Sequence, residues 1–383
     1  MADLTLENVT KRFGAVTAVK ELTLSTPEHE VLVLLGPSGC GKTTTLRMIA
    51  GLEEPDSGTI AFDGQPLQEL APKDRPVAFM RQSYALYPHL TVYENLALWA
   101  RLRGLPAAEI EQRIVWTAER LGLRELLERK PRQLTGGQRM RVALGRTLVR
   151  RPAVYLLDEP LANLDAKLRV QTRAEMLKLN KELQATMVYA THDTHEAMAM
   201  GHRIAVLRDG QVQQIATPHE IYDQPANMFV AGFVGSPAMN FFRSELRHSG
   251  DQLQVDTGAF AVAAPPSFAS RLAAYPKAHV ILGLRPDDLY DRAVAPPSPS
   301  FSAARMQVNV VEYLGRDVVI YLLAGADNPV ARVDSRTRVQ AGDNIDVLID
   351  GSRMHLFDPD SQQAIAGPAR SPRWGVDLGQ QPV

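Results

Sequence analysis

Cysteine is nearly absent from this chain, because Cys40 is the only one among its 383 residues. A lone cysteine excludes an internal disulfide framework and is typical of a reducing compartment. The sequence also lacks an uninterrupted apolar run of the ~20 residues that span a bilayer, and its first residues lack the basic-then-apolar pattern of a signal peptide. We therefore expect a cytosolic protein, or one that reaches a membrane only through other subunits.

A surplus of either charge is missing as well. The chain has 42 Lys and Arg residues and 43 Asp and Glu residues, which gives a formal net charge of -1. No bulk electrostatic attraction to nucleic acid or anionic lipid is therefore expected. The 45% hydrophobic and 22% charged residues are typical of a soluble globular protein, which excludes fibrous, collagenous and wholly disordered chains. The length predicts two or three domains.

The sequence pattern divides the chain into parts. Residues 1–234 alternate short β-rich runs with longer helical patterns, which indicates α/β architecture with a mainly parallel sheet. Within this part, residues 88–150 are rich in Leu, Ala, Glu and Arg and predict a helical insert. From 235 to 366, short alternating segments separated by turn residues predict an all-β domain, and 367–383 are expected to form a loosely ordered tail.

A glycine-rich stretch follows the wholly apolar run 31–35 and matches the pattern G-x-x-x-x-G-K-[ST]. In such a P-loop the backbone N–H groups face a polyphosphate, and the N-terminus of the next helix adds partial positive charge. Lys42 would bridge the outer phosphates, and Thr43 would offer its hydroxyl to Mg²⁺. A glycine-rich turn with an incidental lysine is the alternative, which the flanking strand and helix patterns disfavour. The predicted nucleotide site comprises Gly36, Pro37, Ser38, Gly39, Cys40, Gly41, Lys42, Thr43 and Thr44.

Two carboxylates end the apolar run 154–159. Ligands bind at the carboxyl ends of parallel strands, so these acids are expected beside the P-loop. Asp158 would belong to the Mg²⁺ shell, and Glu159 would polarise an attacking water. Acids at the start of a solvated loop are the alternative, and they are the commoner case only where no P-loop is present.

The run 134–138, Leu-Thr-Gly-Gly-Gln, resembles the signature sequence of ABC-transporter ATPases. The resemblance extends to Gln82 in the position of the Q-loop, Asp165 in the D-loop and His192 as the switch histidine. Phe13 matches the aromatic residue that stacks on adenine in this family. These motifs stand in the family order, so the resemblance implies a P-loop NTPase fold of the ABC type with ATP and Mg²⁺ as ligands.

The resemblance also implies a head-to-tail dimer in which each ATP lies between the P-loop of one subunit and the signature of the other. Glu159 would act as the base, His192 would donate to the γ-phosphate, and Gln82 would connect the Mg²⁺ or water region to the helical insert. Thr43, Gln82 and Asp158 would be the metal ligands. The signature contributes Thr135, Gly136, Gly137 and Gln138, and Asp165 would reach across beside the opposite P-loop.

Two residues depart from the family pattern. Thr135 replaces the usual Ser, keeps the hydroxyl and adds a methyl group. Arg81 stands where an aromatic residue is usual. Its side chain could face solvent, a phosphate group or the partner subunit, and the sequence does not decide between them. The arginines of the helix after the signature are expected to form a solvated face with a few ion pairs, namely Arg139, Arg141, Arg146 and Arg150.

The C-terminal part is similar to the OB-like accessory domain of the sugar and glycerol-3-phosphate importer ATPases of the maltose-importer type. The similarity rests on the segments 284–288, 342–345 and 354–358, on the junction 235–242, and on 84–89 after the Q-loop. It implies the ATP-hydrolysing subunit of an ABC importer for a carbohydrate or glycerol-phosphate-type solute. One alternative is the same type of ATPase for another solute, such as a polyamine, iron or an oxyanion. The other is a soluble ABC ATPase with no role in transport.

The resemblance implies several partners. They are a second ATPase subunit, which is a copy of this chain or a related ATPase, two transmembrane permease subunits and an extracytoplasmic solute-binding protein. We expect the chain at the cytoplasmic face of the plasma membrane as a peripheral subunit. Nucleic-acid binding is not expected, because the C-terminal part has few aromatics and no cluster of Lys and Arg among them.

Overall fold

The computed structural model describes residues 3–249, 252–298 and 300–368. The chain divides into two compact units, and the second begins at His219. This division falls earlier than residue 234, so the short helices α7 (Pro218–Asp223) and α8 (Met228–Phe233) lie in or at the start of the second unit. The tail expected over 367–383 lies outside the described residues, apart from Gly367 and Pro368.

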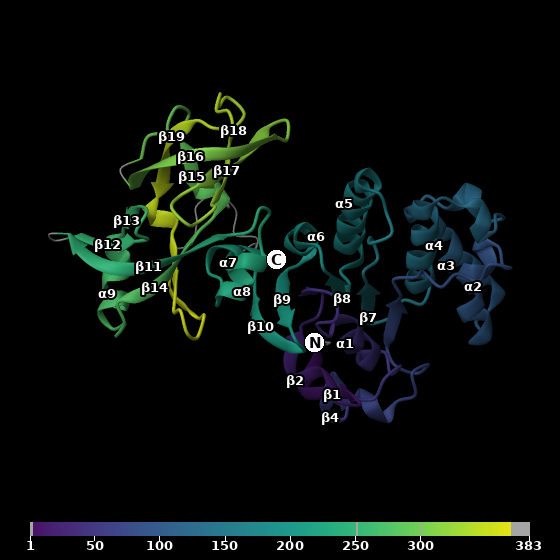
Figure 1. Ribbon diagram of the computed structural model, residues 1–383. Helices are drawn as coiled ribbons and strands as arrows, with labels where there is room; N and C mark the ends of the chain where they lie inside the picture. The colour runs from purple at the N-terminus through teal and green to yellow at the C-terminus, as the bar shows by residue number, and fades with distance from the viewer. Residues whose placement is uncertain (1–2, 250–251, 299, 369–383) are drawn as a thin grey trace. The chain divides into compact units, whose positions relative to one another are not determined.

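The first unit has the expected α/β architecture (Figure 1). Its strands are β1 (Leu4–Phe13), β2 (Val16–Thr26), β3 (Val31–Leu35), β4 (Ser57–Phe62), β5 (Gln65–Pro66), β6 (Val77–Met80), β7 (Val154–Asp158), β8 (Thr186–Thr191), β9 (Arg203–Arg208) and β10 (Gln211–Ala216). Its helices are α1 (Lys42–Ile49), α2 (Val92–Leu102), α3 (Ala107–Arg120), α4 (Gly136–Leu148), α5 (Ala166–Leu183) and α6 (Thr194–Met200), with short 3₁₀ turns at Leu67–Glu69, Arg124–Leu126 and Pro131–Gln133.

The larger sheet of this unit has the strand order β10-β9-β3-β8-β7-β6. Neighbouring strands from β9 to β6 are parallel, and β10 pairs antiparallel with β9 at the edge. Every residue of β3, β7 and β8 is buried, as apolar strands covered on both faces require. A second, antiparallel sheet has the order β2-β1-β4-β5.

The parallel strands end level with one another. Leu35 pairs with Thr191, Asp158 with Ala190, and Met80 with Leu157. The loop after β3, the acidic pair at the end of β7, the glutamine after β6 and the histidine after β8 therefore start at the same edge of the sheet. This is the edge at which α/β proteins bind their ligands.

Helices α2, α3 and α4 form the expected helical insert and lie together (Figure 1). Helix α2 begins with a capping box, in which Thr91 accepts from the backbone of Glu94 and the Glu94 carboxylate accepts from the backbone of Thr91. A Cβ on Gly145 of α4 would lie 2.9 Å from the Leu96 side chain of α2, so glycine allows these helices to pack closely. None of the helices in the described part of the chain is long and apolar enough to cross a membrane.

The second unit is rich in strands, as the sequence pattern predicts. They are β11 (Asn240–Ser249), β12 (Gln252–Asp256), β13 (Ala261–Ala263), β14 (His279–Leu284), β15 (Leu289–Asp291), β16 (Phe301–Tyr313), β17 (Asp317–Leu323), β18 (Val330–Asp334), β19 (Asn344–Asp350), β20 (His355–Phe357) and β21 (Ala364–Ala366), with helix α9 (Ala269–Ala273) and 3₁₀ turns at Pro266–Phe268, Pro286–Asp288 and Gly351–Arg353.

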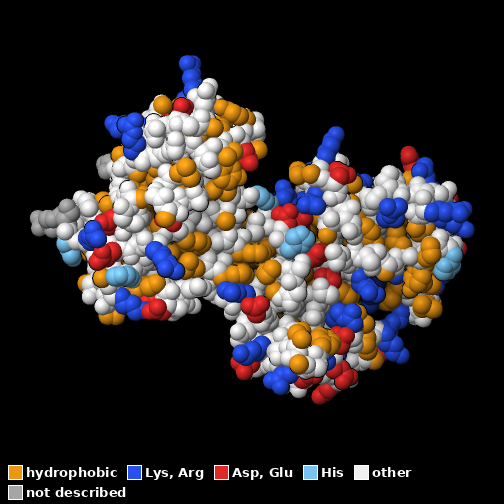
Figure 2. All heavy atoms as spheres, in the orientation of Figure 1, with side chains coloured by type: hydrophobic (Ala, Val, Ile, Leu, Met, Phe, Trp, Pro, Cys, Tyr) orange, Lys and Arg blue, Asp and Glu red, His pale blue; other side chains and the backbone are white. Residues whose placement is uncertain are grey.

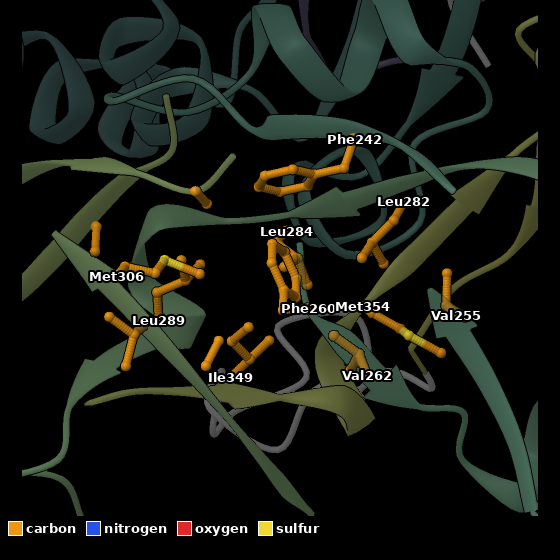
Figure 3. Packing of buried hydrophobic residues seen from close by; sticks show 14 of the residues in the cluster. Phe242, Val255, Phe260, Val262, Leu282, Leu284, Leu289, Met306, Ile349 and Met354 are labelled. Carbon is orange, nitrogen blue, oxygen red and sulfur yellow. The ribbon is translucent and has the colours of Figure 1, made fainter. Parts of the chain in front are cut away.

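Two antiparallel sheets enclose the core of the second unit. Their strand orders are β13-β12-β11-β14-β20-β21 and β15-β19-β16-β17-β18. Side chains from both sheets meet between them, with Phe242 and Leu284 facing Met306 and Ile349 (Figure 3). Burial of such side chains stabilises the fold by about 1.5–3 kcal/mol each.

Candidate nucleotide site

The loop between β3 and α1 curls around the ammonium group of Lys42. Lys42 Nζ donates hydrogen bonds to the carbonyl oxygens of Gly36 (2.8 Å) and Pro37 (2.9 Å). A Cβ on Gly36 would lie 2.4 Å from the carbonyl oxygen of Leu207, so only glycine fits there. Gly41 has a φ of 104° directly before α1, which glycine adopts without strain. Two backbone carbonyls of the loop thus hold the ammonium group of Lys42 in place.

Cys40 lies inside this loop and is buried. Its Sγ lies 3.9 Å from Lys42 Nζ. Burial raises the pKa of the Cys40 thiol, and the charge of Lys42 opposes this shift. A buried thiol with a raised pKa is a weak nucleophile, so Cys40 acts as a small residue that fills the turn.

The hydroxyl of Thr43 donates to Asp158 Oδ1 at 2.9 Å. Asp158 is buried at the end of β7, and burial raises its pKa; the hydrogen bond from Thr43 opposes the shift, and the charge of Glu159 adds to it. The next residue, Glu159, has a φ of 44°, a left-handed conformation that is strained for a residue other than glycine. A hydrogen bond from Glu159 N to the carbonyl of Ala190 (3.0 Å) helps to hold it.

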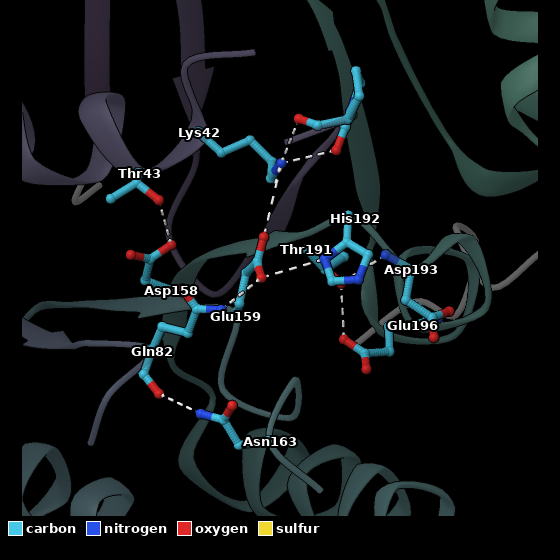
Figure 4. A network of polar contacts seen from close by, with 12 residues as sticks. Lys42, Thr43, Gln82, Asp158, Glu159, Asn163, Thr191, His192, Asp193 and Glu196 are labelled. Atoms are coloured by element: carbon cyan, nitrogen blue, oxygen red, sulfur yellow. Dashed lines mark hydrogen bonds and ion pairs between the residues drawn. The ribbon is translucent and has the colours of Figure 1, made fainter. Parts of the chain in front are cut away.

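Glu159 is the centre of the polar network (Figure 4). Its carboxylate accepts a hydrogen bond from Gln82 Nε2 at 3.2 Å, lies 3.3 Å from His192 Nδ1 and lies 3.9 Å from Lys42 Nζ. The His192 side chain is 54% exposed, so it can reach a ligand as well as Glu159. One carboxylate thus connects the P-loop, the Q-loop and the strand end at β8.

Two further residues support this network, and no sequence motif predicts either of them. Asn163 Nδ2 donates to the backbone carbonyl of Gln82 at 2.9 Å. Glu196 is buried and accepts hydrogen bonds from the hydroxyls of Tyr189 and Thr191, both at 2.9 Å. Thr191 is the residue directly before His192. The only sequence signal for Asn163 is its position between two motifs, and the only one for Glu196 is its position four residues after the switch histidine.

The signature residues cap a helix. Thr135 is the N-cap of α4; its hydroxyl accepts from Gln138 N at 3.3 Å, and Gln138 Oε1 accepts from Thr135 N at 2.9 Å. A Cβ on Gly137 would lie 2.5 Å from the Leu168 side chain, so glycine permits the close approach of α5. Both Thr135 and Gly136 remain accessible, which leaves the helix N-terminus open to an anion.

Phe13 and Asp165 lie outside the network. Phe13 ends β1 with 48% of its surface exposed, and the ammonium of Lys11 lies 5.3 Å from its ring. Asp165 is the N-cap of α5 and accepts from Leu168 N at 3.0 Å. Within the described residues, neither forms a hydrogen bond or ion pair with Glu159 or its partners. Their roles toward adenine and the opposite subunit stay predictions.

Profiles of known families match both parts of the chain. The family described as "ABC transporter" matches residues 19–162, the "MalK OB fold domain" matches 235–289, and the "TOBE domain" matches 282–357. The expected OB-like C-terminal domain is thereby confirmed. The site residues from the P-loop to Glu159 fall within the first match, and His192 lies beyond it.

Curated proteins match over nearly the whole chain. The "Trehalose/maltose import ATP-binding protein MalK" of Thermococcus litoralis is 49% identical over 374 residues, which is 95% of this chain and 100% of that protein. The "Oligosaccharides import ATP-binding protein MsmX" of Bacillus subtilis and the "Osmoprotective compounds uptake ATP-binding protein GgtA" of Synechocystis are each 45% identical over 366 residues, with 95% of this chain and 100% of each relative covered.

Solved structures match the ATPase part. One is the dimeric structure of MJ0796, a bacterial ABC transporter cassette, with a TM-score of 0.51 and 32% identity over 56% of this chain and 98% of that one. A post-hydrolysis state of the same cassette bound to ADP and Pi matches equally well. CbiO1 of Clostridium perfringens, part of an ABC transporter complex, has a TM-score of 0.53 and 28% identity over 57% of this chain and 89% of that one.

Proposed function

Because the chain belongs to the ATP-binding proteins of ABC transporters, we propose that it energises the uptake of a carbohydrate-type solute through separate membrane subunits. It is an ATPase of the ABC type. The observation that carries the proposal is the joint contact of Glu159 with Gln82, His192 and Lys42, in a chain that matches import ATP-binding proteins over 95% of its length.

The residues of the site divide the work of ATP hydrolysis. Lys42 and the P-loop N–H groups hold the phosphates, and Glu159 accepts a proton from the attacking water. Gln82 Nε2 and His192 Nδ1 both contact the Oε2 atom of that carboxylate, and His192 also donates to the γ-phosphate. The backbone bond to Ala190 helps to hold the strained φ of Glu159 and so keeps the carboxylate in one orientation, which favours rapid reaction.

The residues beside Asp158 fit a magnesium ion. Mg²⁺ prefers hard oxygen ligands, and the Thr43 hydroxyl lies 2.9 Å from the Asp158 carboxylate at the edge of the P-loop. The Thr43 hydroxyl, the amide oxygen of Gln82 and Asp158 would hold the ion. When bound, it neutralises negative charge on the outer phosphates.

The accessible signature supports a dimer. In a head-to-tail pair, the open N-terminus of α4 at Thr135 and Gly136 faces the γ-phosphate held by the other copy, with the side chain of Asp165 nearby and Phe13 stacked on adenine. The cassette structure MJ0796 is itself dimeric. We assign a homodimer, two permease subunits and an extracytoplasmic solute-binding protein to the complex, at the cytoplasmic face of the plasma membrane.

The solute class rests on the relatives. MalK and MsmX are named for trehalose, maltose and oligosaccharides, which favours a carbohydrate. GgtA is named for osmoprotective compounds, so a polar osmolyte is the second candidate.

Capture of the complex tests the proposal. The variant Glu159→Gln, tagged and trapped with ATP, is purified from membranes of the source organism, and its partners are identified by mass spectrometry. We expect multi-spanning permeases and a solute-binding protein, whose ligand then decides between carbohydrate and osmolyte. Recovery of soluble or nucleic-acid partners alone would overturn the transport function while leaving the ATPase site intact.

A further inference from the structure

The hairpin formed by β1 and β2 ends in an exposed apolar pair. Phe13 and Val16 are opposite one another in the register, and 48% and 67% of their surfaces are exposed. Directly opposed side chains lie on the same face of a sheet, so these two form one surface, which we call the hairpin platform. Gly14 lies between them with a φ of 58°, and among the described residues only its chain neighbours lie within 4 Å of a Cβ placed there. The tip of the hairpin is therefore open to a flat ligand.

The hairpin platform lies close to the phosphate-binding loop. Strand β2 passes this loop at Ala18, since a Cβ on Gly41 would lie 2.5 Å from the carbonyl oxygen of Ala18. A strand rises about 3.3 Å per residue, so Val16 lies roughly 7 Å along β2 from this contact. A ribose between the phosphates and the base of a nucleotide can bridge a gap of that size.

One face of the Phe13 ring is covered by a cation of the chain. The ammonium group of Lys11 lies over the ring, with Nζ 5.3 Å from the ring centre, which is within the range of a cation–π interaction. The Lys11 side chain is only 13% exposed, whereas Phe13 beside it is largely open. With Lys11 over one face, the other face of the ring remains for a base.

The same ammonium is anchored to the loop 53–56, which follows α1. Lys11 Nζ donates to the carbonyl oxygen of Glu54 at 2.7 Å and lies 3.5 Å from Asp56 Oδ1. The other oxygen of that carboxylate, Asp56 Oδ2, accepts from Arg12 N at 2.6 Å. A side chain and a backbone N–H therefore join the end of β1 to this loop on both sides of Asp56.

The loop 53–56 is itself joined to α1. Arg47 of α1 donates from Nη2 to Glu53 Oε1 at 2.8 Å, and Glu53 N bonds to the carbonyl of Arg47 at 3.3 Å. On the face shown in Figure 2, acidic and basic side chains lie together over the region of β1, β2 and β4. Helix α1 begins at Lys42, so Lys11 connects the Phe13 ring to the helix that carries the lysine of the phosphate-binding loop.

We propose that Lys11 is a positioning residue for the base of the nucleotide, because it holds the Phe13 ring at a fixed place relative to the phosphate-binding loop before the nucleotide binds. The inference rests on the proposed function, in which Phe13 stacks on adenine. A free side chain that becomes ordered on binding lowers the affinity. A ring that Lys11 has already ordered avoids this loss, and the ammonium on one face directs the purine to the other.

Charge removal with retention of the aliphatic stem, Lys11→Met, tests the inference. ATP and inorganic tripolyphosphate, which has no base, are titrated into the full chain with Mg²⁺ by calorimetry. We expect the Kd of ATP to rise about threefold to tenfold, as for the ordering of one side chain, and the Kd of tripolyphosphate to stay unchanged. In steady-state assays KM for ATP rises by a similar factor, and kcat stays within about twofold, because Lys11 does not contact the P-loop or Glu159.

Two further variants serve as rescue and control. Lys11→Arg restores the Kd of ATP to within about twofold, because a guanidinium also stacks on a ring and donates to a carbonyl. Lys20→Met is the matched control, since Lys20 is an exposed lysine of β2 in the same sheet, and it leaves both Kd values unchanged. Thermal unfolding without nucleotide shows that each variant is folded.

A double-mutant cycle with Phe13→Ala separates positioning from a purely structural role. If Lys11 acts through the ring, Lys11→Met has no further effect on the Kd of ATP once position 13 is alanine. An undiminished effect in that background, or an equal weakening of tripolyphosphate binding, overturns the inference. So does an unchanged Kd of ATP in Lys11→Met beside weakened binding in Phe13→Ala. If Phe13→Ala itself leaves the Kd of ATP unchanged, the adenine role in the proposed function fails instead.

A second experiment needs no lysine variant to fold. 4-Fluorophenylalanine is placed at position 13 of the otherwise unaltered chain, and ¹⁹F relaxation is measured without nucleotide. We expect the ring to relax like the same label at position 62, because Phe62 of β4 packs against the core of the first unit. Relaxation typical of a freely rotating side chain would contradict the proposal, since the ring would then not be held before ATP binds.

Discussion

Both units of this protein bury charged side chains, but the distances to the partners of these charges differ between the units. In the second unit, Arg353 lies 3.0 Å from Asp223 and 3.8 Å from Asp288, and all three side chains are largely withdrawn from solvent. Nearby, the buried guanidinium of Arg285 stacks on the ring of Tyr222 at 3.6 Å. These charges have close partners on fixed elements, so they stabilise the fold and leave little freedom for a ligand.

In the first unit, the charges at the strand ends are held more loosely. Lys42 is buried, yet its nearest carboxylate oxygen, on Glu159, is 3.9 Å away, and the ammonium is satisfied by backbone carbonyls. Glu159 shares its carboxylate with Gln82 and the exposed His192. Close pairing of buried charges thus indicates structure, whereas longer contacts beside an open edge indicate a site.

The largest effect on the structural side is expected from Arg353→Met. Removing this cation leaves Asp223 and Asp288 without its charge, which costs about 3–5 kcal/mol of stability. Hydrogen-exchange mass spectrometry of the second unit measures the loss, and ATP binding stays unchanged. Arg336→Met, which removes a surface ion pair with Asp334, is the control and has a much smaller effect. Equal losses of stability from both variants would contradict the distinction between closely paired buried charges and surface ion pairs.

On the functional side, Lys42→Ala weakens ATP binding. A hydrogen bond to a charged group contributes about 1.5–3 kcal/mol, which corresponds to roughly a 10–150-fold rise in Kd. Titration with a fluorescent ATP analogue measures the change, and thermal unfolding without nucleotide reports stability. A variant that binds ATP normally but unfolds early would place Lys42 among the structural charges.

The pH dependence of the second unit follows from His355. Burial lowers the pKa of this imidazole well below its usual value, and the charges of Arg285 and Arg353 lower it further. The unfolded chain therefore binds more protons below about pH 6.5, so the stability that the neutral His355 provides is lost as pH falls below that value, by up to about 1.4 kcal/mol per pH unit.

Urea unfolding between pH 7 and 5 measures this dependence of the unfolding free energy on pH. Hydrogen-exchange mass spectrometry of peptides that contain β14 and β20 follows the unfolding. His355→Gln reduces the slope, and the same change at the exposed His248 does not. An unchanged slope in His355→Gln would show that other groups carry the pH dependence.

The smallest effect is expected from Thr135→Ser. Serine keeps the N-cap hydroxyl that accepts from Gln138, so ATPase turnover stays within about threefold. Thr135→Ala removes the cap, at a cost of about 0.5–2 kcal/mol to helix α4. If serine is as harmful as alanine in steady-state ATPase assays, the methyl group of Thr135 is needed for packing at the proposed dimer interface.

Local motifs made much of the first unit predictable. The P-loop, the acids of β7 and the switch histidine each follow an apolar strand, and parallel strands that end level bring such residues together. The contact between Asn163 and the carbonyl of Gln82 spans 81 residues and has no periodic signal, so the sequence could not predict it.

The buried ion pairs of the second unit could not be predicted from the sequence for the same reason. Arg353 and Asp223 are 130 residues apart, and neither stands in a pattern that indicates an ion pair. The arginines in and after helix α4 show a third limit of prediction from the sequence. A helical pattern predicts which arginines share a face, but the aromatic rings that bury Arg146 and Arg150 come from other segments, so a solvated face was the natural prediction.

Glu159 is proposed as the base of the ATPase site. The most direct test of this role is to measure ATP binding and single-turnover phosphate release for Glu159→Gln in parallel. Glutamine keeps the shape and the hydrogen bonding but cannot accept the proton, so ATP binding should persist while phosphate release falls by about 10²–10⁴-fold. Phosphate release at a near-normal rate would contradict the assignment and would leave Glu159 as a structural partner of Gln82 and His192.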